Sequence, residues 1–561
     1  MPVARLSFER RRRLLRRTLP LVGLALAALA GGLLLGMSRR SAAEARADRF
    51  ARAWERRDYR GMHRELTGSA RSRFPLRSFE RAYRAAADTA TAVSVRAGSA
   101  HAQGGGRVRV PVHVRTRVFG TIAGDVDLPV SDRGVEWSPS LAFPELAPGG
   151  RLGRRSKPPR RAAIVSRDGK VLAAGPAGAR TSPLGALAAS IAGQLGPARS
   201  ARRRERLYAL GFPGRMPVGQ TGLERALEPV LEGRPGGVLI SDRRVLARAR
   251  PRPAPPVRTT IDTRLQRAAV AALGGHLAGI AALDARTAEV RALAGIAFSA
   301  PQPPGSTFKI VTTTAALESH AVKLSDRFPV ASRAIIDGVP LENANGESCG
   351  GSFAQSFAHS CNSVFAPLGV KLGARRLVDA AERYGFNERP AVPGELPSTI
   401  PRAATIRTPL DVGSTAIGQG RVLATPFELA SIAQTVAARG VRTRPTLRAG
   451  QPPRSVRVTS RRVARTLERL MVGVVAYGTG TSAAISGVKV AGKTGTAELG
   501  NTRGPGAQAS GSENTDAWFT GFAPAGHPRI VVAAMFVRAG AGGETAAPAV
   551  RAVIAAALGK G

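Results

Sequence analysis

The chain has 561 residues, too many for one ordinary hydrophobic core and enough for about three domains. Its hydrophobic fraction of 43% is that of a globular protein and excludes wholesale disorder. The formal net charge of +45 either favours an anionic partner or reflects an arginine excess spread along the chain. No single basic stripe carries interleaved aromatic residues, which favours the second explanation. A nucleic-acid partner is not expected, because it is poorly compatible with the membrane anchor described next.

An uncharged segment, residues 19–37, follows a cluster of arginines near the N-terminus. As a helix it would be about 28 Å long, close to the hydrocarbon thickness of a bilayer. A cleaved signal peptide is the alternative, but the segment is longer than a usual signal, and Arg39 and Arg40 separate it from the candidate cleavage site. We therefore expect a cytoplasmic stub (residues 1–18), a single-pass membrane anchor and an extracytoplasmic remainder.

The next segment predicts helices followed by an antiparallel sheet. Residues 42–67 show amphipathic helical spacing, and a second helical segment carries Phe79 and Tyr83. From 107 to 115 valines alternate with arginine and histidine, which indicates a half-buried strand. More strand is expected at 119–120 and 126–130. The pattern predicts a small α+β domain.

Two basic, proline-rich stretches divide the rest of the chain. Residues 148–161 are rich in glycine and proline and predict a linker. A mixed region follows, and residues 167–170 predict a hairpin turn within it. Residues 250–256 form a stiff boundary because of their prolines.

Beyond that boundary, alanine-rich helices alternate with short β-runs. The clearest predicted strands are residues 280–283, 488–491 and 530–536, and residues 501–515 predict a loop. The chain's two cysteines, Cys349 and Cys361, either pair or remain as buried thiols. Their spacing does not suggest a metal site.

Three short segments of this last region carry candidate chemistry. Ser306 and Lys309 form a Ser-x-x-Lys motif at the start of an apolar helical run, where i,i+3 spacing puts both on one face. Residues 360–362 add Ser-Cys-Asn, a second hydroxyl and an amide. Residues 493–496 add Lys-Thr-Gly-Thr at the end of a β-run, where glycine allows an extended peptide to approach. Each motif alone is weak evidence, because serine caps helices and Ser and Asn are common in turns.

In this order, Ser-x-x-Lys, Ser-x-Asn and Lys-Thr-Gly form the motif set of penicillin-binding proteins and serine β-lactamases. The chain also resembles class B penicillin-binding proteins at residues 218–224, 259–262, 417–420 and 516–522. The segment that ends at 135–137 resembles the NTF2-like extension of the subgroup containing the methicillin-resistance protein.

The resemblance implies a multidomain α+β chain. An NTF2-like α+β domain would span residues 41–147, and a mixed pedestal or dimerisation-type domain would span residues 160–250. A transpeptidase domain of the serine β-lactamase-like α/β fold would span residues 257–561, with an antiparallel sheet flanked by helices.

The resemblance also implies roles for the motif residues. Ser306 would be the nucleophile and Lys309 its base, since burial and the cation of Lys493 lower the pKa of a lysine. Ser360 would relay a proton to the leaving amine, and the backbone N–H groups of Ser306 and Thr496 would bind the oxyanion. The expected catalytic residues are Ser306, Lys309, Ser360 and Lys493, and the expected substrate-binding residues are Asn362, Thr494, Gly495 and Thr496.

The implied activity is a peptidoglycan D,D-transpeptidase that cross-links stem peptides through an acyl-enzyme on Ser306. Its implied partners are stem peptides ending in D-alanyl-D-alanine, β-lactams, a polytopic membrane glycosyltransferase and other cell-wall machinery; no cofactor or metal is implied. The alternatives are a β-lactamase or D,D-carboxypeptidase, in which water is the acceptor, and a non-catalytic scaffold of the division machinery that binds β-lactam or muropeptide. His359 is expected to be structural, because adjacency to Ser360 in sequence does not make a triad. Residues 478–481 lack the lysine of a phosphate loop and predict a turn.

Overall fold

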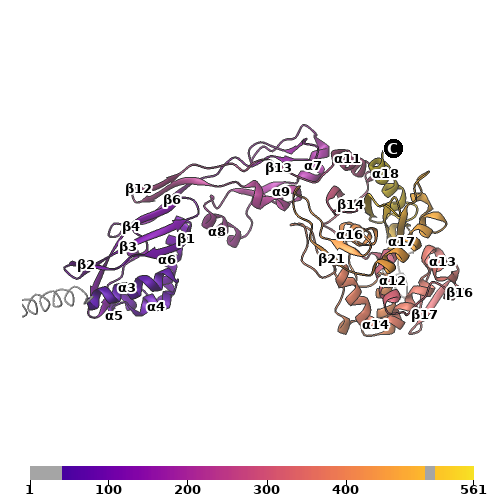
Figure 1. The fold of residues 1–561 in the computed structure, drawn as a ribbon, viewed down its shortest axis with the longest axis horizontal. Helices are drawn as coiled ribbons and strands as arrows, with labels where there is room; N and C mark the ends of the chain where they lie inside the picture. The colour runs from indigo at the N-terminus through magenta and orange to yellow at the C-terminus, as the bar shows by residue number, and fades with distance from the viewer. Residues whose placement is uncertain (1–40, 500–511, 561) are drawn as a thin grey trace, which may run out of the picture. The chain divides into compact units, whose positions relative to one another are not determined.

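The computed structural model describes residues 41–499 and 512–560 and divides them into two compact units, each treated by itself (Figure 1). The small unit contains residues 41–159, 198–216 and 234–252, and the large unit contains the other described residues. The predicted stub and membrane anchor lie outside the described residues. Within the described ranges, no helix is long and apolar enough to span a bilayer.

Four helices open the small unit: α3 (Ala42–Glu55), α4 (Tyr59–Arg64), α5 (Gly68–Arg73) and α6 (Leu76–Ala90). The prediction of one helix over residues 42–67 is wrong. Arg57 takes a left-handed φ of 57°, and the Asp58 carboxylate then caps α4 by accepting from the Gly61 N–H. The helix that carries Phe79 and Tyr83 is confirmed as α6.

The small unit's main sheet covers one core with these helices (Figure 1). Its strands are β1 (Ala92–Ala97), β2 (His101–Gly104), β3 (Arg107–Thr116), β4 (Thr121–Ser131) and β5 (Gly134–Val135), in the order β1-β3-β4-β5 with β2 also paired to β3. The predicted strand at 107–115 is confirmed, and its buried valines pack against the helices. The predicted strand at 119–120 is wrong, because Gly120 has a φ of 73° in the turn between β3 and β4.

A second sheet of the small unit has the order β12-β11-β6. It is formed by β6 (Leu152–Lys157), β11 (Gly236–Ser241) and β12 (Arg244–Ala249), and α8 (Ala201–Leu210) belongs to the same unit. The prediction that residues 148–161 are only a linker is therefore wrong, since β6 pairs with β11 along its whole length. Residues 160–250, expected as one domain, are divided between the two units.

The large unit begins with a group of short elements: β7 (Ile164–Val165), β8 (Val171–Ala173), α7 (Ala186–Ala192), β9 (Leu195–Pro197), β10 (Pro217–Gly219), α9 (Gly222–Ala226), α10 (Glu228–Leu231) and β13 (Val257–Arg258). The hairpin turn predicted at residues 167–170 is confirmed between β7 and β8. Glu224 is buried and accepts from the guanidinium groups of Arg161 and Arg180, both at 2.7 Å. This ion-pair cluster accounts for the glutamate in the segment 218–224.

The large unit is built on a five-stranded antiparallel sheet of order β15-β14-β24-β23-β22. Its strands are β14 (Ala278–Asp284), β15 (Val290–Gly295), β22 (Ala491–Glu498), β23 (Thr515–Ala523) and β24 (Ile530–Phe536). The strands predicted at 280–283 and 530–536 are confirmed. The strand predicted at 488–491 is wrong, because Gly487 and Val488 close a turn and pairing with β23 begins at Ala491. The loop predicted at 501–515 lies mostly outside the described residues.

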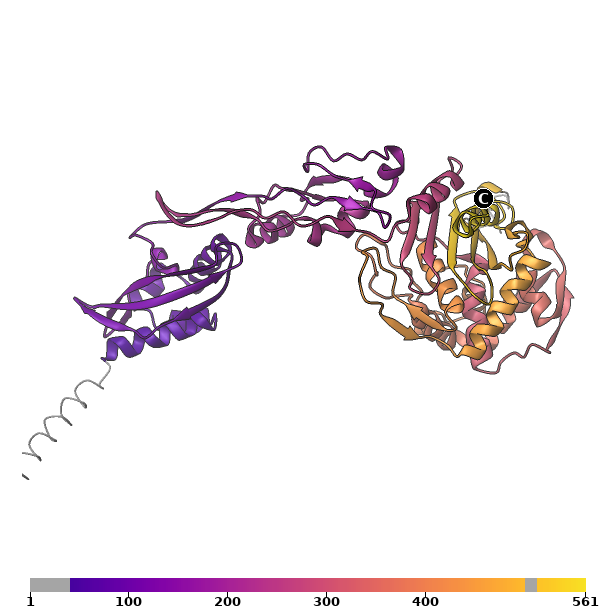
Figure 2. The same cartoon turned by 45° about the horizontal axis from the view of Figure 1, so that its top comes forward.

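Helices cover both faces of this sheet (Figures 1 and 2). They are α11 (Thr263–Ala272), α12 (Lys309–Glu318), α13 (Phe353–Ala358), α14 (Asn362–Tyr384), α15 (Pro409–Ala416), α16 (Pro426–Ala437), α17 (Arg461–Ala476) and α18 (Ala546–Leu558). Alternate side chains of each strand face opposite cores. Ala281 and Leu283 pack with α12, α14 and α16, whereas Ile280 and Ala282 pack with α11 and α18.

Short strands of the large unit lie between α12 and α13, and between α16 and α17. They are β16 (Arg327–Ala331), β17 (Arg333–Ile336), β18 (Val339–Glu342), β19 (Cys349–Ser352), β20 (Val441–Thr443) and β21 (Ser455–Arg457). Strand β16 pairs with β19, and β17 pairs with β18 as a hairpin.

Candidate active site

Ser306 lies at the start of a helix, against the edge of the five-stranded sheet. The turn η3 (Gly305–Phe308) runs directly into α12, so Ser306 and Lys309 lie one helical turn apart. A Cβ on Gly305, which has a φ of 51°, would lie 2.7 Å from the Thr496 carbonyl oxygen, so only glycine permits this close approach to β22. The Ser306 side chain is half-buried, and its hydroxyl makes no hydrogen bond with any described residue.

The Lys309 side chain is completely buried and reaches the second motif. Its Nζ donates to the Ser360 carbonyl oxygen and to Asn362 Oδ1, both at 2.7 Å, and to Ser360 Oγ at 3.3 Å. The ring of Phe365 lies 5.2 Å from the same ammonium group. These contacts join the first motif to the second.

Lys493 approaches the same hydroxyl from the sheet. It lies inside β22 and is completely buried, and its Nζ donates to Ser360 Oγ at 2.8 Å and to the Thr494 carbonyl oxygen at 3.1 Å. The ring of Phe357 lies 5.7 Å from this ammonium group. The Ser360 hydroxyl is therefore a meeting point of two lysines that are distant in sequence.

This arrangement disfavours the charged form of both lysines. Burial lowers the pKa of Lys309 well below its ordinary value, and the nearby charge of Lys493 lowers it further. Burial also lowers the pKa of Lys493 to about 7. A buried lysine that is neutral near neutral pH can accept a proton from a hydroxyl, which an ordinary lysine cannot do.

The second motif lies where α13 ends and α14 begins. Ser360 is in the left-handed region with a φ of 59°, which is uncommon for a residue other than glycine. The Asn362 side chain bridges two groups, because its Nδ2 donates to the Glu342 carbonyl oxygen at 2.6 Å while its Oδ1 accepts from Lys309. Cys361, between these residues, forms a disulfide with Cys349, which decides between the two states expected from the sequence.

The third motif forms part of an edge strand. Residues 493–496 lie within β22 and not after it, and no strand among the described residues pairs with its other edge. Gly495 is packed tightly, since a Cβ there would lie 2.8 Å from the Pro304 carbonyl oxygen. An open edge beside Ser306 can bind an extended peptide as an added strand.

Two features of the site were not identified from the sequence. The Thr479 and Thr494 hydroxyls are 2.5 Å apart, and the Thr479 N–H donates to the Ala358 carbonyl oxygen at 3.1 Å. The turn predicted at 478–481 is confirmed, but nothing in its sequence connects it with β22. The aromatic rings beside the two lysines, Phe357 and Phe365, likewise resemble ordinary core residues in sequence.

His359 does not form a triad with its neighbour. Its side chain is exposed, and its ring centroid lies 6.5 Å from that of Tyr477. Both groups that donate to the Ser360 hydroxyl are lysines. A Ser–His mechanism at Ser360 therefore has no support in the geometry.

Comparison with known proteins identifies the domain that holds this site. The family model of the penicillin-binding protein transpeptidase domain matches residues 278–555. The chain is 31% identical over 426 residues to a protein of Mycolicibacterium smegmatis named peptidoglycan D,D-transpeptidase PbpA, which covers 63% of this chain and 82% of that protein. The PbpA of Mycobacterium tuberculosis is 33% identical over 412 residues, covering 60% of this chain and 79% of that protein.

Solved structures agree with these relatives. The crystal structure of PBPA from Mycobacterium tuberculosis has a TM-score of 0.57 and 27% identity, and covers 71% of this chain and 99% of that chain. The ceftriaxone acyl-enzyme complex of the same protein has a TM-score of 0.56 and 28% identity, with 71% and 98% covered. The chain described here therefore belongs to the class B penicillin-binding protein transpeptidases.

Proposed function

We propose that this chain is a peptidoglycan D,D-transpeptidase that joins stem peptides through an acyl-enzyme on Ser306. The observation that carries the proposal is the convergence of Lys309 and Lys493 on the Ser360 hydroxyl, beside the turn η3 that contains Ser306. The relatives named peptidoglycan D,D-transpeptidase share this domain.

The first half-reaction forms the acyl-enzyme. Ser306 Oγ attacks the carbonyl carbon of the penultimate D-alanine while its proton passes to neutral Lys309, and the backbone N–H groups of Ser306 and Thr496 stabilise the oxyanion. The tetrahedral intermediate then breaks its C–N bond, and the proton reaches the leaving amine through the Ser360 hydroxyl. Terminal D-alanine leaves, and the ester on Ser306 remains.

The second half-reaction reverses these proton transfers. The amine of a neighbouring stem peptide attacks the ester carbon and gives its proton to the Lys309–Ser360 pair. The C–O bond to Ser306 breaks, the serine recovers its proton, and a new amide joins the two stems. Excluding water from the ester at this stage separates a transpeptidase from a carboxypeptidase.

Substrate binding uses the edge strand. The ammonium of Lys493 and the hydroxyl of Thr494 bind the terminal carboxylate, Asn362 binds the donor peptide, and Gly495 and Thr496 line the strand along which the peptide lies. A β-lactam presents a carboxylate beside a reactive carbonyl in the same way. The ceftriaxone acyl-enzyme of the mycobacterial relative supports β-lactams as ligands of this chain.

We further propose that the catalytic domain works outside the membrane, anchored by residues 19–37. The arginine-flanked apolar segment supports this placement, and so does the Cys349–Cys361 disulfide, because disulfides persist in oxidising compartments. The proposed domains are an NTF2-like domain (41–147) and a transpeptidase domain (257–561), with residues 160–250 as a pedestal segment whose parts are divided between the two compact units. A polytopic membrane glycosyltransferase is the proposed partner for glycan synthesis.

An acceptor assay tests the proposed reaction. The full-length chain in detergent is given a pentapeptide stem ending in D-alanyl-D-alanine together with an amine acceptor, and mass spectrometry follows both products. We expect a product that carries the acceptor and depends on Ser306, so that Ser306→Ala forms none. Hydrolysis alone would identify a carboxypeptidase, and rapid turnover of a chromogenic cephalosporin would identify a β-lactamase; either result would refute the proposal.

A further inference from the structure

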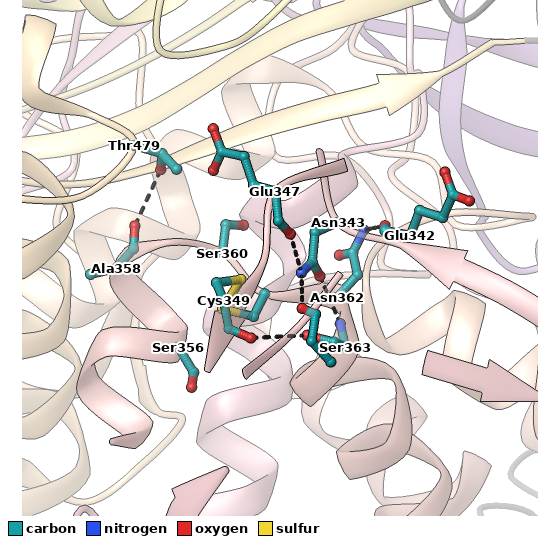
Figure 3. The surroundings of a disulfide bond; sticks show 12 residues. Glu342, Asn343, Glu347, Cys349, Ser356, Ala358, Ser360, Asn362, Ser363 and Thr479 are labelled. Carbon is teal, nitrogen blue, oxygen red and sulfur yellow. Dashed lines mark hydrogen bonds between the residues drawn. A yellow bond between two sulfur atoms is a disulfide. The ribbon is translucent and has the colours of Figure 1, made fainter. Parts of the chain in front are cut away.

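A disulfide lies inside the active-site motif. Cys361 stands between Ser360 and Asn362, and its partner Cys349 begins β19, with the two Cα atoms 5.7 Å apart (Figure 3). Cys349 and Cys361 are the chain's two cysteines, so any thiol chemistry acts on this bond alone. Both side chains are buried.

Hydrogen bonds around the disulfide also join segment 342–349 to the start of α14 (Figure 3). Asn343 Oδ1 accepts from the Ser363 N–H at 2.9 Å, and its Nδ2 donates to the Glu347 carbonyl oxygen at 2.8 Å. The Ser363 hydroxyl donates to the Cys349 carbonyl oxygen at 3.4 Å. The segment 342–349 is therefore fixed to the start of α14, and the disulfide is the covalent element of this junction.

The conformation of Ser360 needs such a restraint. A residue other than glycine at a φ of 59° is disfavoured and persists only where its surroundings impose it. The Ser360 N–H donates to the Phe357 carbonyl oxygen at 3.2 Å. The next residue, Cys361, is held twice, because its N–H donates to the Ser356 carbonyl oxygen at 2.9 Å and its side chain forms the disulfide. If Ser360 relaxed to an ordinary φ, its hydroxyl and its carbonyl oxygen would move relative to Lys309 and Lys493.

The fold itself depends less on this bond. The cysteines are 12 residues apart, and closing so short a loop stabilises a fold less than closing a long one. Both residues also belong to a core cluster that extends through α12, α14, α16 and α17. The position of the bond, inside the second motif, therefore suits local positioning better than general stabilisation.

We propose that the Cys349–Cys361 disulfide is a positioning element for acylation, which holds Ser360 and Asn362 in place against Lys309. This inference rests on the proposed function, because it concerns the same proton-transfer groups. With Cys349 and Cys361 as thiols, the chain keeps its fold and its β22 carboxylate contacts but acylates slowly. Acylation at the full rate thus requires the oxidised pair.

The variant Cys349→Ser tests this, because it removes the bond and leaves residues 360–362 unchanged. The full-length chain is acylated by a fluorescent penicillin, and the acylation rate constant is separated from the preceding binding constant by varying the penicillin concentration. We expect the rate constant to fall by roughly tenfold to a hundredfold. Binding should change little, since Lys493 and Thr494 lie on β22 and not on the linked segments. Val553→Ala is the control for lost stability, because Val553 is buried in α18 on the other face of the sheet.

A second arm uses the wild-type chain. A small dithiol gives two electrons and two protons to the disulfide and closes to its own cyclic disulfide, leaving Cys349 and Cys361 as thiols. The acylation rate constant should fall by the same factor and recover on reoxidation. Because it uses the wild-type chain, this experiment still tests the proposal if Cys349→Ser does not fold. An unchanged rate constant in the fully reduced chain, or an equal fall in Val553→Ala at matched stability, would overturn the inference. A wild-type chain that is not acylated at all would overturn the proposed function as well.

Discussion

Lys493 combines a positive charge with complete burial, and these two properties predict the pH dependence of acylation. Burial lowers its pKa to about 7, so in the free enzyme its charge is lost as the pH rises through that value. Lys309 must be neutral to act as a base, so its titration sets the acid limb of the profile. We expect the second-order acylation rate constant of the wild type to fall above a pH of about 7.

The variant Lys493→Arg isolates that alkaline limb, because arginine stays protonated throughout. Its profile should lack the fall above pH 7 even if the plateau is lower, since the shape and not the height reports the titration. Stopped-flow acylation by a β-lactam across the pH range measures both profiles. The same alkaline limb in the variant and the wild type would show that another group is responsible.

Glu428 is a second residue whose charge state depends on burial. Burial raises its pKa to about 8, although Arg442 opposes the shift, and its Oε1 has no hydrogen-bond partner among the described residues. When the pKa of a carboxyl is higher in the folded state than in the unfolded state, the free energy of unfolding decreases as the pH rises from the unfolded-state pKa to the folded-state pKa. Glu428→Gln removes this loss, at most about 1.4 kcal/mol per pH unit. The variant's advantage in thermal midpoint should grow from pH 5 to 8, and a constant difference would contradict this assignment.

The identities of the motif residues could be predicted from the sequence, but several of their partners could not. Ser306, Lys309, Ser360 and Lys493 stand in recognisable motifs whose order implies a common site. Their catalytic roles stay predictions until the variants are measured. Thr479 could not be predicted, because only folding brings it to within 2.5 Å of Thr494.

The pairing of the two cysteines could not be predicted from the sequence either. Their spacing allowed a disulfide or two thiols equally, and the β16–β19 pairing that brings Cys349 towards Cys361 has no signal of its own. The positioning role proposed for the disulfide rests on the contacts between segment 342–349 and the start of α14, which the sequence does not show.

At the level of elements, the site depends on the close contact between η3 and β22. A methyl group added by Gly495→Ala would lie 2.8 Å from the Pro304 carbonyl oxygen and 3.0 Å from Thr307 Cγ2, so η3 must move away. We expect acylation to slow by about a hundredfold, because the Ser306 hydroxyl and the Thr496 N–H lose their alignment. The matched control is Gly178→Ala, where a Cβ would meet nothing within 4 Å. Equal rates in the two variants would show that the contact does not align the site.

The regular elements followed from their patterns, and the irregular ones did not. Strand β24 is apolar throughout and buried on both faces, so its bounds matched the prediction. The bounds of β22 did not match the prediction. The valines before it have high β propensity, whereas the polar Lys-Thr-Gly segment, which lies inside the strand, does not show a strand pattern. The break after α3 depends on a left-handed Arg57, which helical periodicity does not report.

At the level of the whole molecule, the chain crosses between the units several times. Proline-rich stretches suggested consecutive domains, but residues 160–197 and 217–233 belong to the large unit, while 198–216 and 234–252 belong to the small one. The sequence does not predict this division between the units, because local composition indicates linkers but not which segments pack together in the folded chain. The domain holding the site was nevertheless identified, since its three motifs and the family match fall in one stretch.

This interleaving predicts that a chain cut at Pro253 is less stable than the full chain. The cut removes apolar side chains that belong to the same core as the catalytic helices, namely Ile164, Leu172, Ile191, Leu223, Leu227 and Leu231. Each fully buried side chain of this size stabilises by about 1.5–3 kcal/mol. The temperature at which half of the penicillin labelling is lost should therefore fall in the shortened chain, and an unchanged temperature would contradict the shared core.

The central claim is that Ser306 becomes acylated with the help of two lysines meeting at Ser360. Intact-mass analysis of the full-length chain after exposure to penicillin, followed by peptide mapping, tests this most directly. The account predicts one covalent adduct per chain, located on the peptide that contains Ser306 and absent from Ser306→Ala. An adduct on another residue, or an equal adduct in Ser306→Ala, would contradict it.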